Sequence, residues 1–242
     1  EMGRDDIVTL SRCAYIGAQK FGTLVWSGDI PSTFESLRKQ VKSGLNMAMC
    51  GIPWWTTDIG GFYGGDIESD EFRELIVRWF QYGVFCPVFR LHGSRNGHDR
   101  TRDIIEPSGG DNELWSFGDR DYEILRDLVF LRERLRPYIH DQMAIASKDG
   151  VPVMRPLIFD WPEDETCTSI GDEFLFGDDI LFAPIVNRGE TSRRVYLPAG
   201  EWVFARDGKE YAGGQWITCT AELNEFIAFV KKGASVLSAF QA

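Results

Sequence analysis

The sequence has no long apolar run and no paired cysteine motif. Its apolar runs fall well short of the ~20 residues that a membrane-spanning helix needs, so we expect no transmembrane segment and no membrane partner. The five cysteines are odd in number, widely spaced and without a Cys-x-x-Cys pair. Neither a disulfide framework nor a zinc site is therefore predicted, and we expect no metal and no other cofactor.

Basic residues are also in short supply. The chain carries 26 Lys and Arg against 37 Asp and Glu, a formal net charge of -11 that opposes binding to nucleic acid. Hydrophobic residues make up 43% and aromatic residues 13%, which is typical of a globular chain of one or two domains. Neutral partners fit this composition best.

The first 150 residues alternate between β-prone runs and helical patterns, the arrangement of βα units around a parallel sheet. The predicted strands are residues 7–10, 22–26, 45–50 and 84–89. The predicted helices are residues 32–44, from a Ser32/Glu35 capping box to Gly44, then 70–83, then 119–148 with a kink at Pro137. The connection between the first two strands is too short for a crossover helix, so we expect it to be irregular.

Polar residues follow these strands and gather at one end of the predicted sheet: Arg12, Asp29, Asp58, Arg90 and His92. Asp58 lies in residues 51–65, a stretch of glycines and aromatics that begins near the indoles of Trp54 and Trp55. Flat apolar faces, a strong acceptor and closely approaching backbone suit a sugar ring. The alternative is a Trp-rich core turn with a capping aspartate.

After Gly150 the pattern changes to short β-prone runs separated by turn signals, which predicts a small antiparallel β domain of sandwich type. We place the domain boundary between residues 156 and 157, giving an α/β domain at 1–156 and an all-β domain at 157–242. Residues 96–118, rich in Gly, Asp, Asn and Arg, read as a long surface loop beside the site.

Five motifs, in order, carry a family resemblance. They are Arg12, Trp-Ser-Gly-Asp at 26–29, Trp-Thr-Thr-Asp-Ile-Gly-Gly-Phe at 55–62, Phe-Arg-Leu-His-Gly at 89–93, and Leu-Arg-Pro-Tyr at 135–138 with Arg-Pro at 155–156. Together they resemble glycoside hydrolase family 31, the α-glucosidases and α-xylosidases. The resemblance implies the second half of a (β/α)8 TIM barrel followed by an antiparallel β-sandwich domain.

The resemblance also implies a retaining exo-glycosidase acting on an oligosaccharide or glycoside. Asp29 would be the general acid/base, protonated when it meets the glycosidic oxygen. The pocket for the terminal sugar would be lined by Arg12, Trp26, Asp58, Phe62, Arg90 and His92. Taken alone, His92 also fits a structural histidine and Arg90 a partner for a nearby acid. No role is assigned to His98 or His140.

One expected element is missing. Retaining hydrolysis needs two carboxyl groups about 5 to 5.5 Å apart, and residues 1–28 contain no match to the Lys-x-Asp motif that carries the nucleophile in this family. Asp5 and Asp6 precede the first strand, at the wrong end. We therefore expect the amino-terminal half of the same enzyme to supply the nucleophile, and this chain alone to be inactive.

Other readings stay open. The chain could instead be a non-catalytic carbohydrate-binding or scaffold fragment, or part of a transglycosylase that uses the same residues. The sequence does not distinguish glucose from xylose. We expect that Glu1 is not the natural start and that the compartment is the cytoplasm. The oligomeric state is open, and a homo-oligomer is one possibility.

Overall fold

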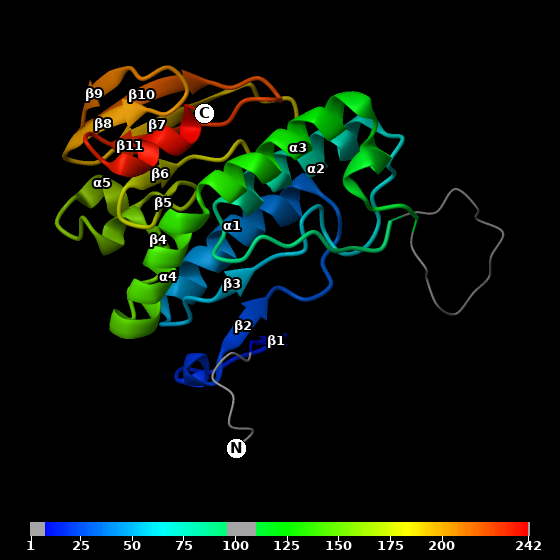
Figure 1. Ribbon diagram of the computed structural model, residues 1–242, viewed down its shortest axis with the longest axis horizontal. Helices are drawn as coiled ribbons and strands as arrows, with labels where there is room; N and C mark the ends of the chain where they lie inside the picture. Colours follow the sequence, from blue (N-terminus) through cyan, green and yellow to red (C-terminus); the bar gives the residue numbers. More distant parts are fainter. Residues whose placement is uncertain (1–7, 96–109, 242) are drawn as a thin grey trace.

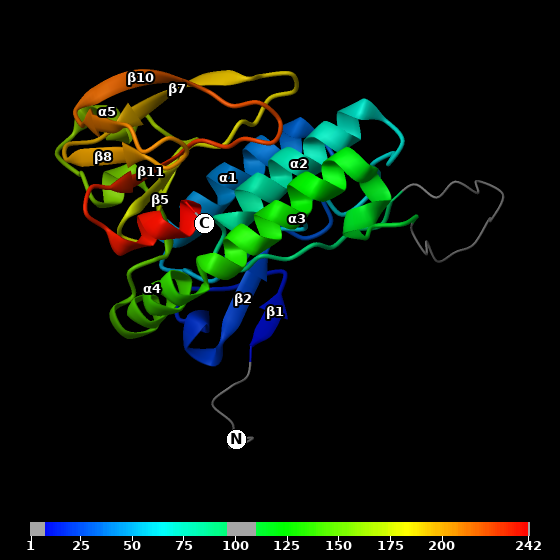
Figure 2. The ribbon, with the colours of Figure 1, turned by 45° about the horizontal axis from the view of Figure 1, so that its top comes forward.

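A computed structural model describes residues 8–95 and 110–241. Its α/β part holds a small parallel sheet with helices packed on one side, and an all-β part packs against those helices (Figures 1 and 2). Within the described ranges, no helix has both the length and the apolar character required to cross a membrane.

The parallel sheet has three strands in the order β1 (Thr9–Ser11), β2 (Thr23–Trp26) and β3 (Trp55–Thr56). A 3-10 helix at Ala18–Phe21 occupies the short β1–β2 connection, which confirms the predicted irregularity. At this edge of the sheet, Val8, which directly precedes β1, is 71% exposed and Leu10 of β1 is 42% exposed. The apolar side chains along this edge therefore lack cover within the described chain.

The predicted fourth strand, residues 84–89, is wrong as an element. Val84 ends a helix, and Pro87 has no N–H to give to a ladder. The segment still runs alongside β3, since the Val88 amide donates to the Trp55 carbonyl at 3.2 Å and Ile59 forms a parallel bridge with Leu91. Arg90 is therefore delivered to the expected edge.

The predicted third strand, residues 45–50, is also wrong, because helix α1 (Phe34–Met49) continues through it. Gly44 is a packing position and not a stop: a Cβ there would lie 2.8 Å from Nε1 of Trp55, so the glycine lets α1 approach β3 closely. The helix begins one residue later than predicted, since the Thr33 hydroxyl, and not Ser32, accepts from the Ser36 amide at 3.1 Å.

The other helices follow the predictions. Helix α2 (Asp70–Val84) is capped by Ser69, and the long pattern splits into α3 (Asp119–Arg134) and α4 (Arg136–Asp149) beside Pro137. A 3-10 helix spans Leu114–Phe117. The rest of the predicted surface loop, residues 96–109, lies outside the described residues, as do Asp5, Asp6 and His98.

The all-β part contains a six-stranded antiparallel sheet in the order β4-β5-β6-β11-β8-β9 and a two-stranded sheet of β10 and β7. The strands are β4 (Met154–Pro156), β5 (Phe174–Phe176), β6 (Ile180–Phe182), β7 (Ser192–Leu197), β8 (Glu201–Phe204), β9 (Glu210–Ala212), β10 (Gln215–Thr220) and β11 (Ala228–Lys231). Short helices lie at Leu157–Phe159, Glu165–Thr168 (α5) and Ser235–Phe240. The predicted sandwich-type domain is present, and β4 already pairs with β5.

The α/β and all-β parts share one hydrophobic core. Phe85, directly after α2, stacks on Phe182 of β6 with ring centroids 4.1 Å apart, and Tyr82 meets Phe174 edge to face at 6.2 Å. All four rings are buried in the same cluster. Because these rings are buried together, the α/β part and the all-β part are packed against each other continuously and are not joined by a flexible linker.

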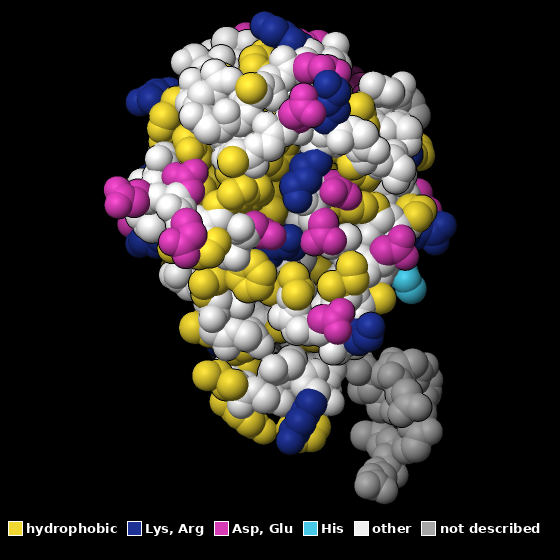
Figure 3. All heavy atoms as spheres, turned by 90° about the vertical axis from the view of Figure 1, so that its left-hand side faces the viewer, with side chains coloured by type: hydrophobic (Ala, Val, Ile, Leu, Met, Phe, Trp, Pro, Cys, Tyr) yellow, Lys and Arg dark blue, Asp and Glu magenta, His cyan; other side chains and the backbone are white. Residues whose placement is uncertain are grey.

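The surface carries charge of both signs. On the face shown in Figure 3, acidic and basic side chains are intermixed, and hydrophobic side chains are exposed between them. Among the described residues, no three His, Cys, Asp or Glu side chains are grouped closely enough to hold a metal ion.

One buried acid makes the stability of the all-β part depend on pH. Glu173 is fully buried, and burial raises its pKa to about 8. An unfolded chain gives up this proton near pH 4.5, so the folded state keeps one proton more between about pH 4.5 and 8. Over that window its contribution to stability falls by about 1.4 kcal/mol per pH unit.

We expect Glu173→Gln to flatten this slope, because the glutamine side chain stays neutral at every pH. Its oxygen can still accept the hydrogen bond that the Tyr196 backbone N–H donates to Oε1 of Glu173 at 3.0 Å in the wild type. Urea unfolding of both proteins at pH 5 and pH 8.5 measures the difference. An unchanged pH slope in the variant would contradict the assignment.

Candidate active site

Asp29 and Arg12 stand at the carboxyl ends of neighbouring parallel strands. Arg12 follows β1 directly, and Asp29 follows β2 after a turn at Gly28, whose φ of 74° is left-handed. The Arg12 guanidinium forms an ion pair with Oδ2 of Asp29, and both side chains are exposed.

Asp58 is the buried acid of the site. It follows β3, is fully buried, and accepts through Oδ1 from Nη2 of Arg90. Burial raises the pKa of Asp58, the positive charges of Arg90 and His92 lower it, and the negative charge of Asp29 raises it. The two aspartates are therefore close enough to sense each other's charge.

Aromatic rings connect these charged groups. The guanidinium carbons of Arg12 and Arg90 each lie 5.8 Å from the ring centroid of Trp26. The rings of Phe62 and His92 lie 5.6 Å apart, and His92 is exposed. All seven predicted site residues thus lie at one end of the sheet, in two groups of contacts: Arg12, Asp29, Trp26, Arg90 and Asp58 form one, and Phe62 and His92 form the other. Their individual roles remain a prediction.

The stretch 51–65 divides between site and core. Trp55 is 4% exposed and packs inside against α1, so the prediction that the two indoles offer faces to a sugar is wrong for Trp55. Trp54 lines a cavity of about 970 Å³, together with Phe21, Pro53 and Met143. This cavity lies by the amino ends of the strands, and within the described chain its lining includes none of the seven site residues. Size alone therefore does not locate the chemistry.

The glycines of this stretch serve internal packing. A Cβ on Gly61, whose φ is 81°, would lie 2.7 Å from Cα of Ser32, and one on Gly65 would lie 2.5 Å from the Phe72 ring. The predicted close approach of backbone is real, but here the approaching group is the protein's own.

Sequence reasoning missed Arg95, a buried arginine that contacts the loop after Asp58. Its acceptors are mainly backbone carbonyls, which leave no mark in the sequence. Its place in the sequence nevertheless indicates that Arg95 lies near the site, because it comes three residues after His92 and directly after Gly93 and Ser94.

The α/β part gathers acids and arginines at the carboxyl ends of its strands, and an antiparallel β domain follows it. This arrangement is typical of the catalytic part of a barrel enzyme. Residues 2–142 match the family model described as "Glycosyl hydrolases family 31 TIM-barrel domain". Residues 150–236 match the "Glycosyl hydrolase family 31 C-terminal domain". The chain belongs to glycoside hydrolase family 31, as the resemblance predicted.

Solved and curated relatives agree with this assignment. The structure of an α-xylosidase from a soil metagenome complexed with xylose is 49% identical, with a TM-score of 0.92, over 98% of this chain and 36% of that one. The α-xylosidase of Saccharolobus solfataricus is 34% identical over 94% of this chain and 29% of its own length. A Flavobacterium johnsoniae dextranase complexed with glucose is 36% identical, with a TM-score of 0.83, over 94% of this chain and 27% of that one. The chain thus spans about a third or less of these relatives.

Proposed function

We propose that this chain is part of a retaining, exo-acting α-glycosidase that removes terminal α-linked xylose or glucose, with Asp29 as general acid/base. The observation that carries the proposal is the position of Asp29: at the carboxyl end of β2, paired with Arg12, and electrostatically coupled to Asp58. The names of the relatives support the substrate class, since one structure holds xylose and another glucose.

In this mechanism Asp29 first protonates the oxygen of the leaving group while a second carboxylate forms a glycosyl ester with the sugar. Asp29 then takes a proton from the water that cleaves the ester, which restores both carboxyl groups. Trp26 gives the sugar an apolar wall, and Asp58 and His92 hold its hydroxyl groups.

Asp58 is an unsuitable nucleophile. Its Oδ1 is paired with Arg90, and its Oδ2, which has no hydrogen-bond partner within the described residues, is the acceptor that this proposal gives to a sugar hydroxyl. We infer that the nucleophile comes from chain that precedes these residues in the parent enzyme. The open β1 edge, with Val8 and Leu10 exposed, is consistent with more barrel on that side.

The test compares turnover of aryl α-xyloside and aryl α-glucoside by this 242-residue chain and by the natural full-length polypeptide. We expect turnover by the full-length polypeptide and none above background by the chain alone, because we infer that the second carboxylate comes from another part of the enzyme. Appreciable turnover by the chain alone that Asp29→Asn abolishes would contradict the missing nucleophile. Binding of xylose or glucose without turnover by the full-length polypeptide would favour the carbohydrate-binding alternative.

Transglycosylation uses the same residues, with a sugar hydroxyl in place of water. Products longer than the donor, seen when acceptor sugar is added to the same assay, would identify it. The cytoplasmic location and homo-oligomeric state stay predictions.

A further inference from the structure

Arg95 is a buried cation whose donors reach three separate segments of the site. It is 2% exposed, and its guanidinium lies over the Phe72 ring at 4.9 Å. The hydrogen bonds run from Nη1 to the Ser32 hydroxyl (3.0 Å), the Gly60 carbonyl (3.3 Å) and the Gly61 carbonyl (2.8 Å), from Nη2 to the Ile59 carbonyl (3.1 Å), and from Nε to Oδ1 of Asn112 (2.7 Å).

These acceptors lie beside the groups that the proposed chemistry uses. The carbonyls at 59–61 belong to the short segment between Asp58 and Phe62, and Ser32 comes three residues after Asp29. One side chain therefore connects the loop of the acid/base to the loop of the buried acid. The planar fork of an arginine can serve several acceptors in fixed directions at once, which a lysine cannot.

The backbone around Arg95 makes room for the guanidinium. A Cβ on Gly60 would lie 2.8 Å from Nη2 of Arg95, and a Cβ on Gly93 would lie 2.5 Å from the same atom. Gly60 has a φ of 88°, which a residue with a side chain rarely adopts. The glycines and the arginine therefore fit one another as a unit.

Removing the guanidinium would leave buried carbonyls without donors. The hydrogen bonds to Ile59, Gly60 and Gly61 satisfy three consecutive carbonyls that belong to no regular ladder. Burial lowers the pKa of Arg95 to about 10, and attraction to Asp58 opposes that fall, so the group stays charged at neutral pH. A buried charge with satisfied partners holds its surroundings in one arrangement.

We propose that Arg95 is a positioning residue that sets Asp58 and Phe62 relative to Asp29. The inference rests on the proposed glycosidase function for its kinetic consequences, but its structural content stands apart from that function. A shift of about 1 Å in the positions of reacting or binding groups can cost about 100-fold in rate, so loss of this contact should appear in catalysis and not in stability alone.

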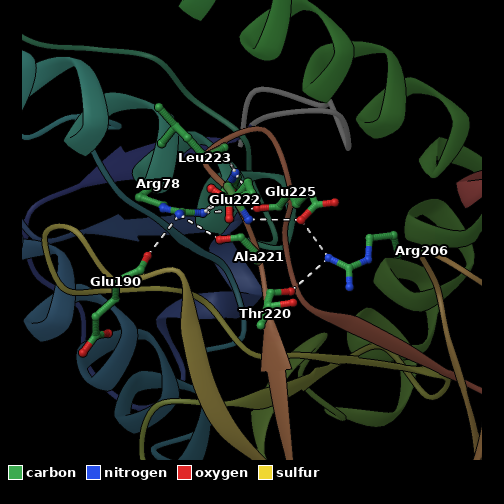
Figure 4. Close-up of polar contacts among 9 residues, drawn as sticks. Arg78, Glu190, Arg206, Thr220, Ala221, Glu222, Leu223 and Glu225 are labelled. Atoms are coloured by element: carbon green, nitrogen blue, oxygen red, sulfur yellow. Dashed lines mark hydrogen bonds and ion pairs between the residues drawn. The ribbon is translucent and has the colours of Figure 1, made fainter.

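Arg78 provides a matched control, because it is also 2% exposed and also donates mainly to backbone carbonyls. Figure 4 shows its guanidinium, from α2, reaching the all-β part: the acceptors are the carbonyls of Glu190, Ala221, Glu222 and Glu225. These contacts hold the two parts together and touch none of the site loops. Arg78→Met should therefore lower stability without moving Asp58.

The kinetic experiment uses the natural full-length polypeptide, assayed with aryl α-xyloside and α-glucoside well below the unfolding temperature of every variant. We expect Arg95→Met to lower kcat/KM about 100-fold, with part of the loss in kcat, and Arg95→Lys to lie between it and wild type. We expect Arg78→Met to stay within about twofold of wild type. Equal effects of Arg95→Met and Arg78→Met on kcat/KM would overturn the proposal.

Hydrogen exchange of the same proteins gives a readout that needs no turnover. The Gly61 amide donates to the Asp58 carbonyl at 2.9 Å and the Phe62 amide to the Ile30 carbonyl at 2.8 Å. We expect these amides to exchange about 10-fold faster or more in Arg95→Met and at the wild-type rate in Arg78→Met. If the wild type turns over no α-glycoside, the proposed function fails, and exchange alone decides the role of Arg95. Unchanged exchange in Arg95→Met would refute it.

Discussion

Replacing Asp29 by Asn should lower turnover of an α-xyloside or α-glucoside by the natural full-length polypeptide about 100- to 10,000-fold. The amide is close in shape but cannot donate the proton that the leaving oxygen needs, nor accept one from water later. Its contact with Arg12 loses charge, yet both side chains are exposed, so the variant should remain folded.

The leaving group separates loss of proton transfer from general damage. Aryl groups that leave readily as anions need little protonation, so Asp29→Asn should slow them much less than it slows an alkyl or sugar leaving group. Asp141→Asn, an equivalent change at an exposed position on α4, is the control and should be silent. An equal loss on all leaving groups, or wild-type turnover by Asp29→Asn, would refute the acid/base role.

Replacing Arg90 by Met should lower the free energy of unfolding by about 3–5 kcal/mol, because it leaves a fully buried carboxylate without its cationic partner. The loss should depend on pH. Burial already raises the pKa of Asp58, and the positive charge of Arg90 opposes that rise. Without Arg90 the pKa of Asp58 should therefore rise further. The destabilisation should be smaller at pH 4, where about half of the unfolded chains also hold this proton, and should grow as the pH rises toward 7.

A double variant isolates the cause. Arg90→Met combined with Asp58→Leu removes both charges and should recover much of the stability lost by Arg90→Met alone. Urea unfolding at pH 4 and pH 7 measures all three proteins. A loss in Arg90→Met that is independent of pH, or a double variant less stable than the single one, would contradict the buried ion pair.

Local signals in the sequence were sufficient for the elements whose ends are defined by their neighbours in the chain. Helix α2 was predicted over residues 70–83, and the structure has it at Asp70–Val84 with Ser69 as its cap and an apolar face that is buried. The all-β part was predicted from short β-prone runs separated by turn signals after Gly150, and strands β4 to β11 all lie after that residue. The gathering of polar residues at one end followed from parallel strands alone.

The errors have a common physical origin in contacts between distant residues. Gly44 was interpreted as a helix end because its meaning depends on Trp55, and the run after it was interpreted as a strand for that reason. Arg95 was not selected because its partners are carbonyls of residues 59–61, and every residue has a carbonyl. The burial of Asp58 and the core position of Trp55 likewise depend on contacts with residues that are distant in the sequence.

The stacking of Phe85 on Phe182 limits how the two parts of this chain can be exchanged with those of relatives. Gene shuffling that exchanged only the residues after about 150 would bring an unrelated surface against Tyr82 and Phe85. The apolar surfaces of the two parts would then no longer be complementary. Engineers who seek chimeras of such enzymes should therefore move the C-terminal module together with the helix whose end it covers.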